Sequence, residues 1–166
     1  VRRVLGFTLK PVDGPLRTAL GEVALPLQRP PARAEIERTA ATGASTQKWV
    51  AEQMLRRLNE GGVLPAEHRV PVAVWQFGTD LTFVGLPGEV VVDYVRLIEE
   101  ALGPQRLWLA AYCHDTFGYV PSARVLREGG YETRGLYHGG IGYFAPEAQD
   151  ALVGKVRELA ASAGRL

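Results

Sequence analysis

The fold is decided by residues 81–112, which read LTFVGLPGEVVVDYVRLIEEALGPQRLWLAAY. Leu81–Leu86 is an apolar run of strand length, and Leu107–Tyr112 is a second one. Between the two runs, apolar residues recur at the spacing of one helix face: Val91, Val95, Ile98 and Leu102. Gly103-Pro104 ends this helix. A strand, a helix and a strand with short connections predict a right-handed crossover between two parallel strands.

Two polar side chains are predicted to meet at one edge of this unit. Glu89 follows the turn Leu86-Pro87-Gly88, where the first strand ends and the helix is predicted to begin. Tyr119, in the run Gly118-Tyr119-Val120-Pro121, lies just beyond the second strand. Because open α/β sheets bind ligands at the carboxyl ends of their strands, we expect a functional site at this edge.

The rest of the chain predicts an α/β domain with a mixed β-sheet and flanking helices. Further strands are expected at residues 1–10, 22–27 and 70–77, and further helices at about 32–42, from 45 to 60, at 122–128 and from 146 to about 161. Pro26 predicts an edge strand, and Ser45 is expected to cap its helix. The two helices between residues 32 and 60 are expected to pack as a pair on the outside of the sheet. Gly78-Thr79-Asp80 predicts a hairpin loop before Leu81.

Composition fits one packed domain and excludes several classes of protein. The 166 residues are 46% hydrophobic with a net charge of +1, which gives no field to recruit nucleic acid or anionic lipid. Cys113 is the only cysteine, so an internal disulfide and a thiolate metal cluster are excluded. No apolar run approaches the roughly 18 residues of a membrane span. Because a strand-like run is already under way at Val1, we expect residues 1–166 to be a single α/β domain or the carboxyl-terminal fragment of a larger catalytic domain.

Each candidate site residue also has a purely structural explanation. A carboxylate in the first turn of a helix is stabilised by the helix dipole by about 0.3–1 kcal/mol, which would account for Glu89. Tyr119 fits a core or rim aromatic, and Tyr131, after Gly129-Gly130, fits a ring packed under a glycine loop. The functional alternatives are a metal ligand or acid–base group for Glu89, and a hydrogen-bond donor to a carbonyl or an oxyanion for Tyr131. Taken singly, these residues name no reaction.

The histidines and the cysteine suggest no site of their own. His68 precedes a strand and is expected to face solvent. His114 and Asp115 resemble a dyad, but adjacent residues point in different directions, so a local turn contact is expected. His138 is interpreted as a loop residue and Cys113 as a small buried residue. Three scattered histidines do not make a self-contained zinc site.

Taken together, the motifs resemble a known family. Leu86-Pro87-Gly88-Glu89, then Tyr119-Val120 and then Tyr131-Glu132 are similar to the carboxyl half of the neutral/alkaline (non-lysosomal) ceramidase family. The similarity is closer to bacterial ceramidase-like hydrolases that read Gly-Tyr-Val-Pro-Ser and Glu-Gly-Gly-Tyr-Glu, as residues 118–122 and 128–132 do here. The most specific part is the spacing of twelve residues between the two tyrosines.

The resemblance implies a zinc-dependent amide hydrolase. In that family the glutamate of the Pro-Gly-Glu turn and the tyrosine of the Tyr-Val pair are zinc ligands, which assigns these roles to Glu89 and Tyr119. The tyrosine twelve residues further on contacts the substrate amide, which assigns a catalytic role to Tyr131. The implied cofactor is Zn2+, and the implied substrate is an N-acyl sphingosine or a related lipid amide, cleaved to a fatty acid and an amine.

The resemblance also implies a partner. The histidine zinc ligands of the family lie in its amino-terminal half, so that half of the same protein is the implied partner, and residues 1–166 alone are expected to be inactive. Neither a nucleic acid nor a membrane span is expected. The sequence does not fix the compartment, and the resemblance is compatible with a secreted or periplasmic protein.

The match is clearest from Val70 to Tyr137 and has departures. The interval from Glu89 to Tyr119 is several residues shorter than in well-known members, His114 stands where members often carry asparagine, and Val90-Val91-Val92 stands where threonines are common. Two other classes of protein stay open. One is a non-catalytic α/β module that binds a ligand or a partner through the same edge. The other is a scaffold in which Glu89 only starts a helix.

Overall fold

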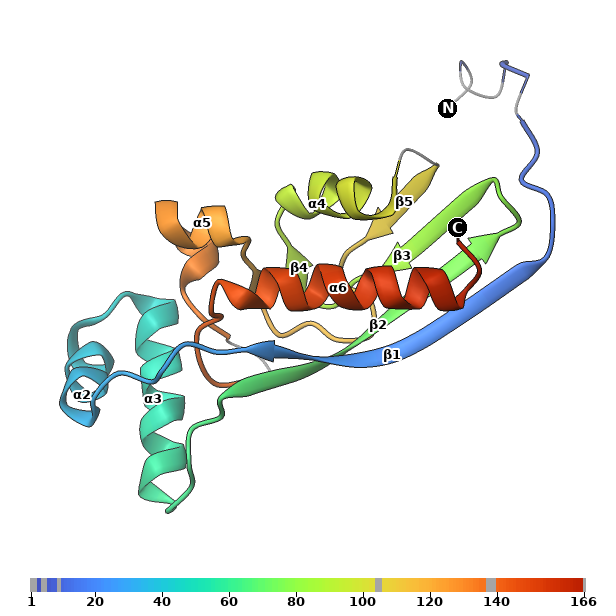
Figure 1. Ribbon diagram of the computed structural model, residues 1–166. Helices are drawn as coiled ribbons and strands as arrows, with labels where there is room; N and C mark the ends of the chain where they lie inside the picture. The colour runs from blue at the N-terminus through green and yellow to red at the C-terminus, as the bar shows by residue number, and fades with distance from the viewer. Residues whose placement is uncertain (1–2, 4–5, 9, 104–105, 137–139, 166) are drawn as a thin grey trace.

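The computed structural model describes residues 3, 6–8, 10–103, 106–136 and 140–165, which form an α/β fold with a mixed sheet (Figure 1). The main sheet has the order β1-β2-β3-β5, built from β1 (Leu16–Pro26), β2 (Glu67–Phe77), β3 (Leu81–Gly85) and β5 (Leu107–Ala110). β1 and β3 run antiparallel to β2, whereas β5 runs parallel to β3. The predicted fold class, hairpin and parallel crossover are confirmed, and the strand that ends at Pro26 is at an edge of the described sheet.

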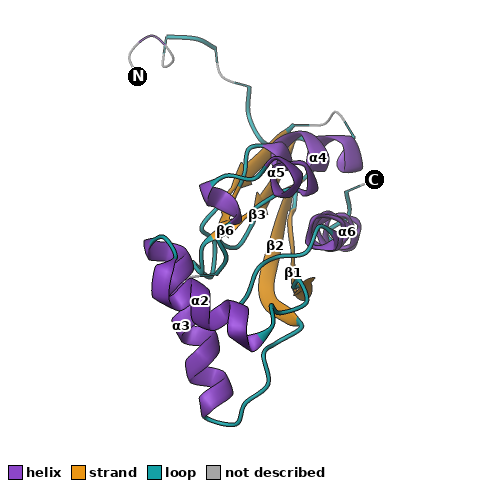
Figure 2. Cartoon of the chain, turned by 90° about the vertical axis from the view of Figure 1, so that its left-hand side faces the viewer, coloured by secondary structure: helices purple, strands orange, loops and turns teal. Residues whose placement is uncertain are grey.

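Helices cover one face of the sheet. α6 (Glu147–Ser162) lies along β1 and β2, and α4 (Asp93–Leu102) lies beside it on the same side (Figures 1 and 2). Alternate residues of a strand point to the same face, so β2 presents every second side chain to these helices. Among the fully buried core residues of β2 and α6 are Val70, Val72, Val74, Leu152 and Val156.

The opposite face of the sheet carries a row of aromatic side chains. Trp75, Phe83 and Trp108 are cross-strand neighbours on β2, β3 and β5. The ring centroids of Trp75 and Phe83 are 5.4 Å apart, and those of Phe83 and Trp108 are 6.1 Å apart. Trp108 is 63% exposed. The strand expected at residues 107–112 is therefore formed only over Leu107–Ala110, and it is an exposed edge strand of the described sheet instead of a buried one.

The paired helices α2 (Arg33–Thr42) and α3 (Ser45–Asn59) form a separate small core around Ile36, Val50 and Met54. They lie beyond the ends of β1 and β2, so the expected position on the outside of the sheet is wrong (Figure 1). The expected cap is also wrong. Ser45 is the first helical residue of α3, and the residue before it makes no side-chain capping hydrogen bond.

The strand expected at residues 1–10 is not formed by the described residues of that range. β1 begins at Leu16, which is opposite Phe77, the last residue of β2. β2 ends there because the chain turns at Gly78. A strand before Leu16 would therefore have no β2 residues left as hydrogen-bonding partners.

A second, two-stranded sheet lies beyond the carboxyl ends of β3 and β5. It pairs β4 (Glu89–Val90) with β6 (Tyr119–Val120) in parallel. α4 begins at Asp93, so the prediction of a helix that starts at Glu89 is wrong. The physical reason is that the backbone of residues 89–91 donates hydrogen bonds to the carbonyl groups of residues 118–120, at 2.8 and 3.3 Å, instead of forming a helical turn.

The predicted apolar stripe of α4 is only partly correct. Ile98 is buried as expected, but Tyr94 is buried in place of Val95, which is 42% exposed. The hydroxyl of Tyr94 lies 3.3 Å from the carbonyl oxygen of Pro121 and donates to it, which satisfies its one polar group inside the core. Within the described ranges, no helix combines the length and the apolar character needed to cross a membrane.

Candidate functional site

The turn that follows β3 is fixed by the loop that follows β5. Gly88 donates its backbone N–H to the Asp115 carbonyl, and the Gly88 carbonyl accepts from the Tyr112 N–H, both at 2.8 Å. Gly88 has a φ of 62°, and a β-carbon there would lie 2.8 Å from the carbonyl oxygen of Gly118 and 2.8 Å from the ring of Phe117. Only glycine combines this conformation with so close an approach, so the two loops are held in one register.

This register places two of the predicted residues side by side. Glu89 of β4 is directly opposite Tyr119 of β6, and opposite residues project from the same side of a ladder. The next pair, Val90 and Val120, points the other way, and Val120 is fully buried in the main core. The short ladder therefore sends its apolar pair inward and its polar pair outward, and both Glu89 and Tyr119 are half-buried.

Tyr131 reaches the same place from the far end of α5 (Ala123–Glu128), a helix that agrees with the prediction. Gly129 and Gly130, with φ values of 78° and 129°, turn the chain from α5 into the short 3-10 helix η1 (Tyr131–Thr133). The rings of Tyr119 and Tyr131 are perpendicular, at 88°, with centroids 5.2 Å apart. Their hydroxyl oxygens are 3.5 Å apart. The three residues singled out from the sequence thus form one group, here called the tyrosine–glutamate cluster.

Tyr119 is at the centre of the tyrosine–glutamate cluster. Its hydrogen bond with Tyr131 is the largest cause of a raised pKa of Tyr119, followed by loss of hydration and by Glu89, which hydrogen-bonds to the phenol and repels a phenolate. A carboxylate only accepts, so Tyr119 is the donor to Glu89. The Tyr131 hydroxyl has a hydrogen of its own, so it can donate to the Tyr119 oxygen while Tyr119 donates to Glu89. The 3.5 Å between the two hydroxyls exceeds the roughly 2.7–2.8 Å of a typical O–H···O bond, so this contact is loose.

Two of the three structural explanations fail here. Glu89 is in a strand, so the helix-dipole explanation is wrong for it, and the acidic residue in the first turn of α4 is Asp93. Tyr131 is 56% exposed, so its ring is not packed under the glycine loop. Tyr119, in contrast, is half-buried at the rim of the domain, which agrees with its structural alternative.

The donor set of the cluster fits part of a zinc site. Glu89 and Tyr119 offer two oxygen donors from adjacent strands. Catalytic zinc sites commonly use about three protein ligands and leave one position open. In the described part of the chain, no group of three or more His, Cys, Asp or Glu side chains is arranged to hold a metal ion. A zinc ion at Glu89 and Tyr119 would therefore need further protein ligands.

His68 does not face solvent, contrary to expectation. It is in β2, where its ring packs edge-on against Phe117 with centroids 4.5 Å apart. Its Nε2 is buried without a hydrogen-bond partner in the described residues. Burial lowers the pKa of His68, against a smaller opposing effect of the negative charge of Asp115. His68 is thus a packing residue against Phe117 whose neutral form is favoured.

The remaining candidates are peripheral. His114 is exposed, with a φ of 70°, and its ring lies nearly parallel to Trp75 with centroids 6.3 Å apart. The carboxylate of Asp115 accepts the next backbone N–H at 2.8 Å, which is the local turn contact expected. Cys113 is half-buried, and not fully buried as expected. His138 lies outside the described residues.

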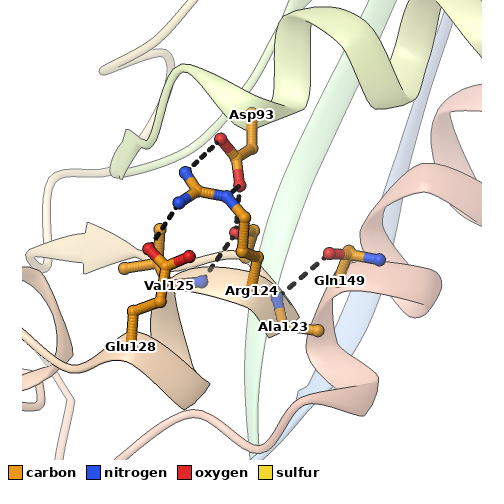
Figure 3. A network of polar contacts seen from close by, with 7 residues as sticks. Asp93, Ala123, Arg124, Val125, Glu128 and Gln149 are labelled. Atoms are coloured by element: carbon orange, nitrogen blue, oxygen red, sulfur yellow. Dashed lines mark hydrogen bonds and ion pairs between the residues drawn. The ribbon is translucent and has the colours of Figure 1, made fainter.

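A second polar group, here called the Asp93 clamp, was missed by the sequence reasoning (Figure 3). Asp93 accepts a hydrogen bond from the Ser122 hydroxyl at 2.5 Å, and two from the Arg124 guanidinium at 2.9 and 2.7 Å. Ser122 was expected only at the start of a helix, and Asp93 only inside one. Because Asp93 and its partners are about thirty residues apart, no local pattern in the sequence pairs them.

Comparison with models of protein families, with curated proteins and with solved structures finds no match to this chain.

Proposed function

We propose that this chain supplies part of the active site of a zinc-dependent amide hydrolase of neutral ceramidase type. The observation that carries the proposal is the meeting of Glu89, Tyr119 and Tyr131 on three different elements. The resemblance of short motifs assigns the same three residues to one site. Residues that are distant in sequence have no local reason to meet, so their convergence supports the assignment.

The chain's own residues have distinct proposed roles. Glu89 and Tyr119 would hold the metal ion from adjacent strands, and the further ligands would be histidines from the amino-terminal half of the same protein. A bound zinc ion would lower the pKa of a water molecule toward about 7 and polarise the amide carbonyl. Tyr131, more exposed than Tyr119, would donate a hydrogen bond to the oxygen of the scissile carbonyl as negative charge develops there.

The proposed reaction is hydrolysis of an N-acyl sphingosine or a related lipid amide. One water molecule is consumed, its oxygen joins the acyl carbon, the C–N bond breaks, and the nitrogen leaves as an amine. The acyl group leaves as a fatty acid. The open, exposed position of Tyr131 is compatible with a substrate that approaches from solvent or from a second protein segment.

Metal binding should be linked to the ionisation of Tyr119. In the metal-free protein, Tyr131, reduced hydration and Glu89 all favour the neutral phenol. A divalent cation between Glu89 and Tyr119 would offset the repulsion by Glu89 and favour the phenolate. Zinc binding at this site should therefore release a proton and produce a tyrosinate ultraviolet absorption, both of which are measurable without substrate.

The deciding experiment measures zinc per chain in the complete gene product and in its Glu89→Ala variant, with release of fatty acid from N-acyl sphingosine as the second readout. We expect about one zinc per chain, lost together with activity in the variant. Glu100→Ala, on an exposed position of α4, is the matched control and should keep both. Absence of zinc from the unmodified protein would overturn the proposal and leave a ligand-binding α/β domain.

A further inference from the structure

The two strands that carry Glu89 and Tyr119 are too short to define their own geometry. β4 and β6 are two residues each, and in the described structure they pair only with each other. Isolated two-stranded pairs are marginally stable even when they are longer. Something outside the ladder must therefore hold Tyr119 against Glu89. The turn at Gly88 holds only the amino-terminal end of the ladder.

The Asp93 clamp holds the carboxyl-terminal end of the ladder. Asp93 follows β4 after two residues, and Ser122 follows β6 after one. The Asp93 side chain is 15% exposed and accepts three hydrogen bonds, two of them from Nε and Nη2 of one guanidinium. Such bidentate, charge-assisted pairs combine strength with a fixed geometry. Consistent with this, the hydrogen bonds from Arg124 and then from Ser122 lower the pKa of Asp93.

The same clamp reaches Tyr131 through α5. Ser122 caps α5 by accepting the Val125 N–H at 3.1 Å, and Arg124 is in the first turn of this helix (Figure 3). α5 is six residues long and leads through two exposed glycines directly to Tyr131. α5 also contacts α6 and η1, and the Ala123 N–H donates to Gln149 of α6 at 3.0 Å. The Asp93 clamp is thus one of the contacts that fix the orientation of α5, and this orientation influences where Tyr131 lies relative to Tyr119.

We propose that Asp93 is a positioning residue, which acts through Ser122 and Arg124 to hold Tyr119 and Tyr131 in place against Glu89. Its importance for catalysis rests on the function proposed above, but its effect on the distance between the tyrosines does not. Asp93 touches no member of the tyrosine–glutamate cluster in the contacts of the described residues, so it would not be catalytic itself.

The test measures the contact between the two tyrosine rings in the complete, metal-free protein by nuclear Overhauser effects between labelled ring protons. In the unmodified protein the 5.2 Å centroid distance predicts a strong effect. Asp93→Ala should weaken it severalfold while the far-ultraviolet circular dichroism is unchanged. Glu128→Gln is the matched control, because it removes the other ion pair of Arg124 and leaves Asp93 with all its donors.

A second variant guards against a folding defect. Arg124 is exposed, so Arg124→Gln is compatible with a folded domain, and it should weaken the ring contact in the same direction. A ring contact that is fully retained in Asp93→Ala would overturn the proposal. If Asp93→Ala does not fold, a ring contact that is fully retained in Arg124→Gln would overturn it.

A kinetic readout separates the positioning role from the function. If the protein is an amide hydrolase, Asp93→Ala should lower kcat by about 10- to 100-fold with little change in KM. The reason is that misplaced tyrosines would stabilise the transition state less well, while the rest of the substrate would still bind. If the unmodified protein binds no zinc but Asp93→Ala loses the ring contact, the positioning role is supported and the function is overturned. If the unmodified protein binds zinc but Asp93→Ala keeps the ring contact, the function is supported and the positioning role is overturned.

Discussion

The tyrosine–glutamate cluster and the Asp93 clamp lie at opposite ends of the same two short strands, and they are built differently. In the clamp, one carboxylate accepts three hydrogen bonds at 2.5, 2.7 and 2.9 Å. In the cluster, the two hydroxyls are 3.5 Å apart, which is long for an O–H···O bond. The first group is held by short hydrogen bonds, whereas the second is held loosely.

This difference indicates which group maintains structure and which is free to interact. A polar group that is fully hydrogen-bonded contributes to stability, and a third partner would have to displace an existing one. A loosely bonded group at the surface is hydrated, and its bonds to water can be exchanged for bonds to a ligand. The scaffold alternative for Glu89 requires the satisfied arrangement at Glu89, but in this fold that arrangement is found at Asp93. Asp93, and not Glu89, therefore has the structural role that the scaffold alternative describes, and ligand binding by Glu89 is the proposal that the zinc measurement tests.

The largest expected effect comes from Gly88→Ala, which should disrupt the frame that the two groups share. The new β-carbon would lie 2.8 Å from the Gly118 carbonyl oxygen and 2.8 Å from the Phe117 ring, at a φ of 62°. Backbone strain and overpacking together predict a loss of roughly 2–5 kcal/mol in the free energy of unfolding. Urea denaturation would measure this loss.

Gly103→Ala is the matched control for Gly88→Ala. Gly103 also has a positive φ, with φ 80° and ψ 176°, but its β-carbon would meet nothing within 4 Å among the described residues. The substitution should cost only the backbone strain, about 1–3 kcal/mol. Equal losses in the two variants would contradict the close approach of the loops around Gly88.

The next effect separates the two tyrosines within the cluster. If Tyr119 is a metal ligand and Tyr131 is a donor to the substrate, Tyr119→Phe should lose zinc, whereas Tyr131→Phe should keep zinc and lose about 100- to 1,000-fold in kcat. Metal analysis and initial rates on N-acyl sphingosine would measure the two effects. Tyr143→Phe, in the small core around α2 and α3, is the control and should change neither. Loss of zinc in both cluster variants would mean that the two tyrosines do not have separate roles.

The contrast between the two groups also shows what the sequence could predict. The hairpin follows from the apolar runs around Gly78-Thr79-Asp80, and the β3–α4–β5 crossover follows from apolar runs and from Gly103, all of which act locally. The members of the tyrosine–glutamate cluster were identified by motifs. One prediction about their geometry was wrong. Glu89 lies in a strand and not at a helix start, because the pairing of β4 with β6 overrides the helical pattern. The Asp93 clamp and the burial of His68 could not be predicted, since both depend on partners from distant segments.

The smallest expected effect is a pH dependence confined to the clamp. The pKa of Asp93 is below its ordinary value of 3.8, so at pH values between the folded and the unfolded pKa the unfolded chain binds more protons than the folded one. The stability from this carboxylate is complete above the unfolded pKa and is lost as the pH falls through the folded pKa. Asp93→Asn should therefore lower the urea midpoint at pH 7 and make little difference at the acid end of the range. If the difference in urea midpoint between Asp93→Asn and the unmodified protein stays constant down to the acid end, the charge of Asp93 is not what holds α5. The packing and uncharged hydrogen bonds of the side chain would then account for the clamp.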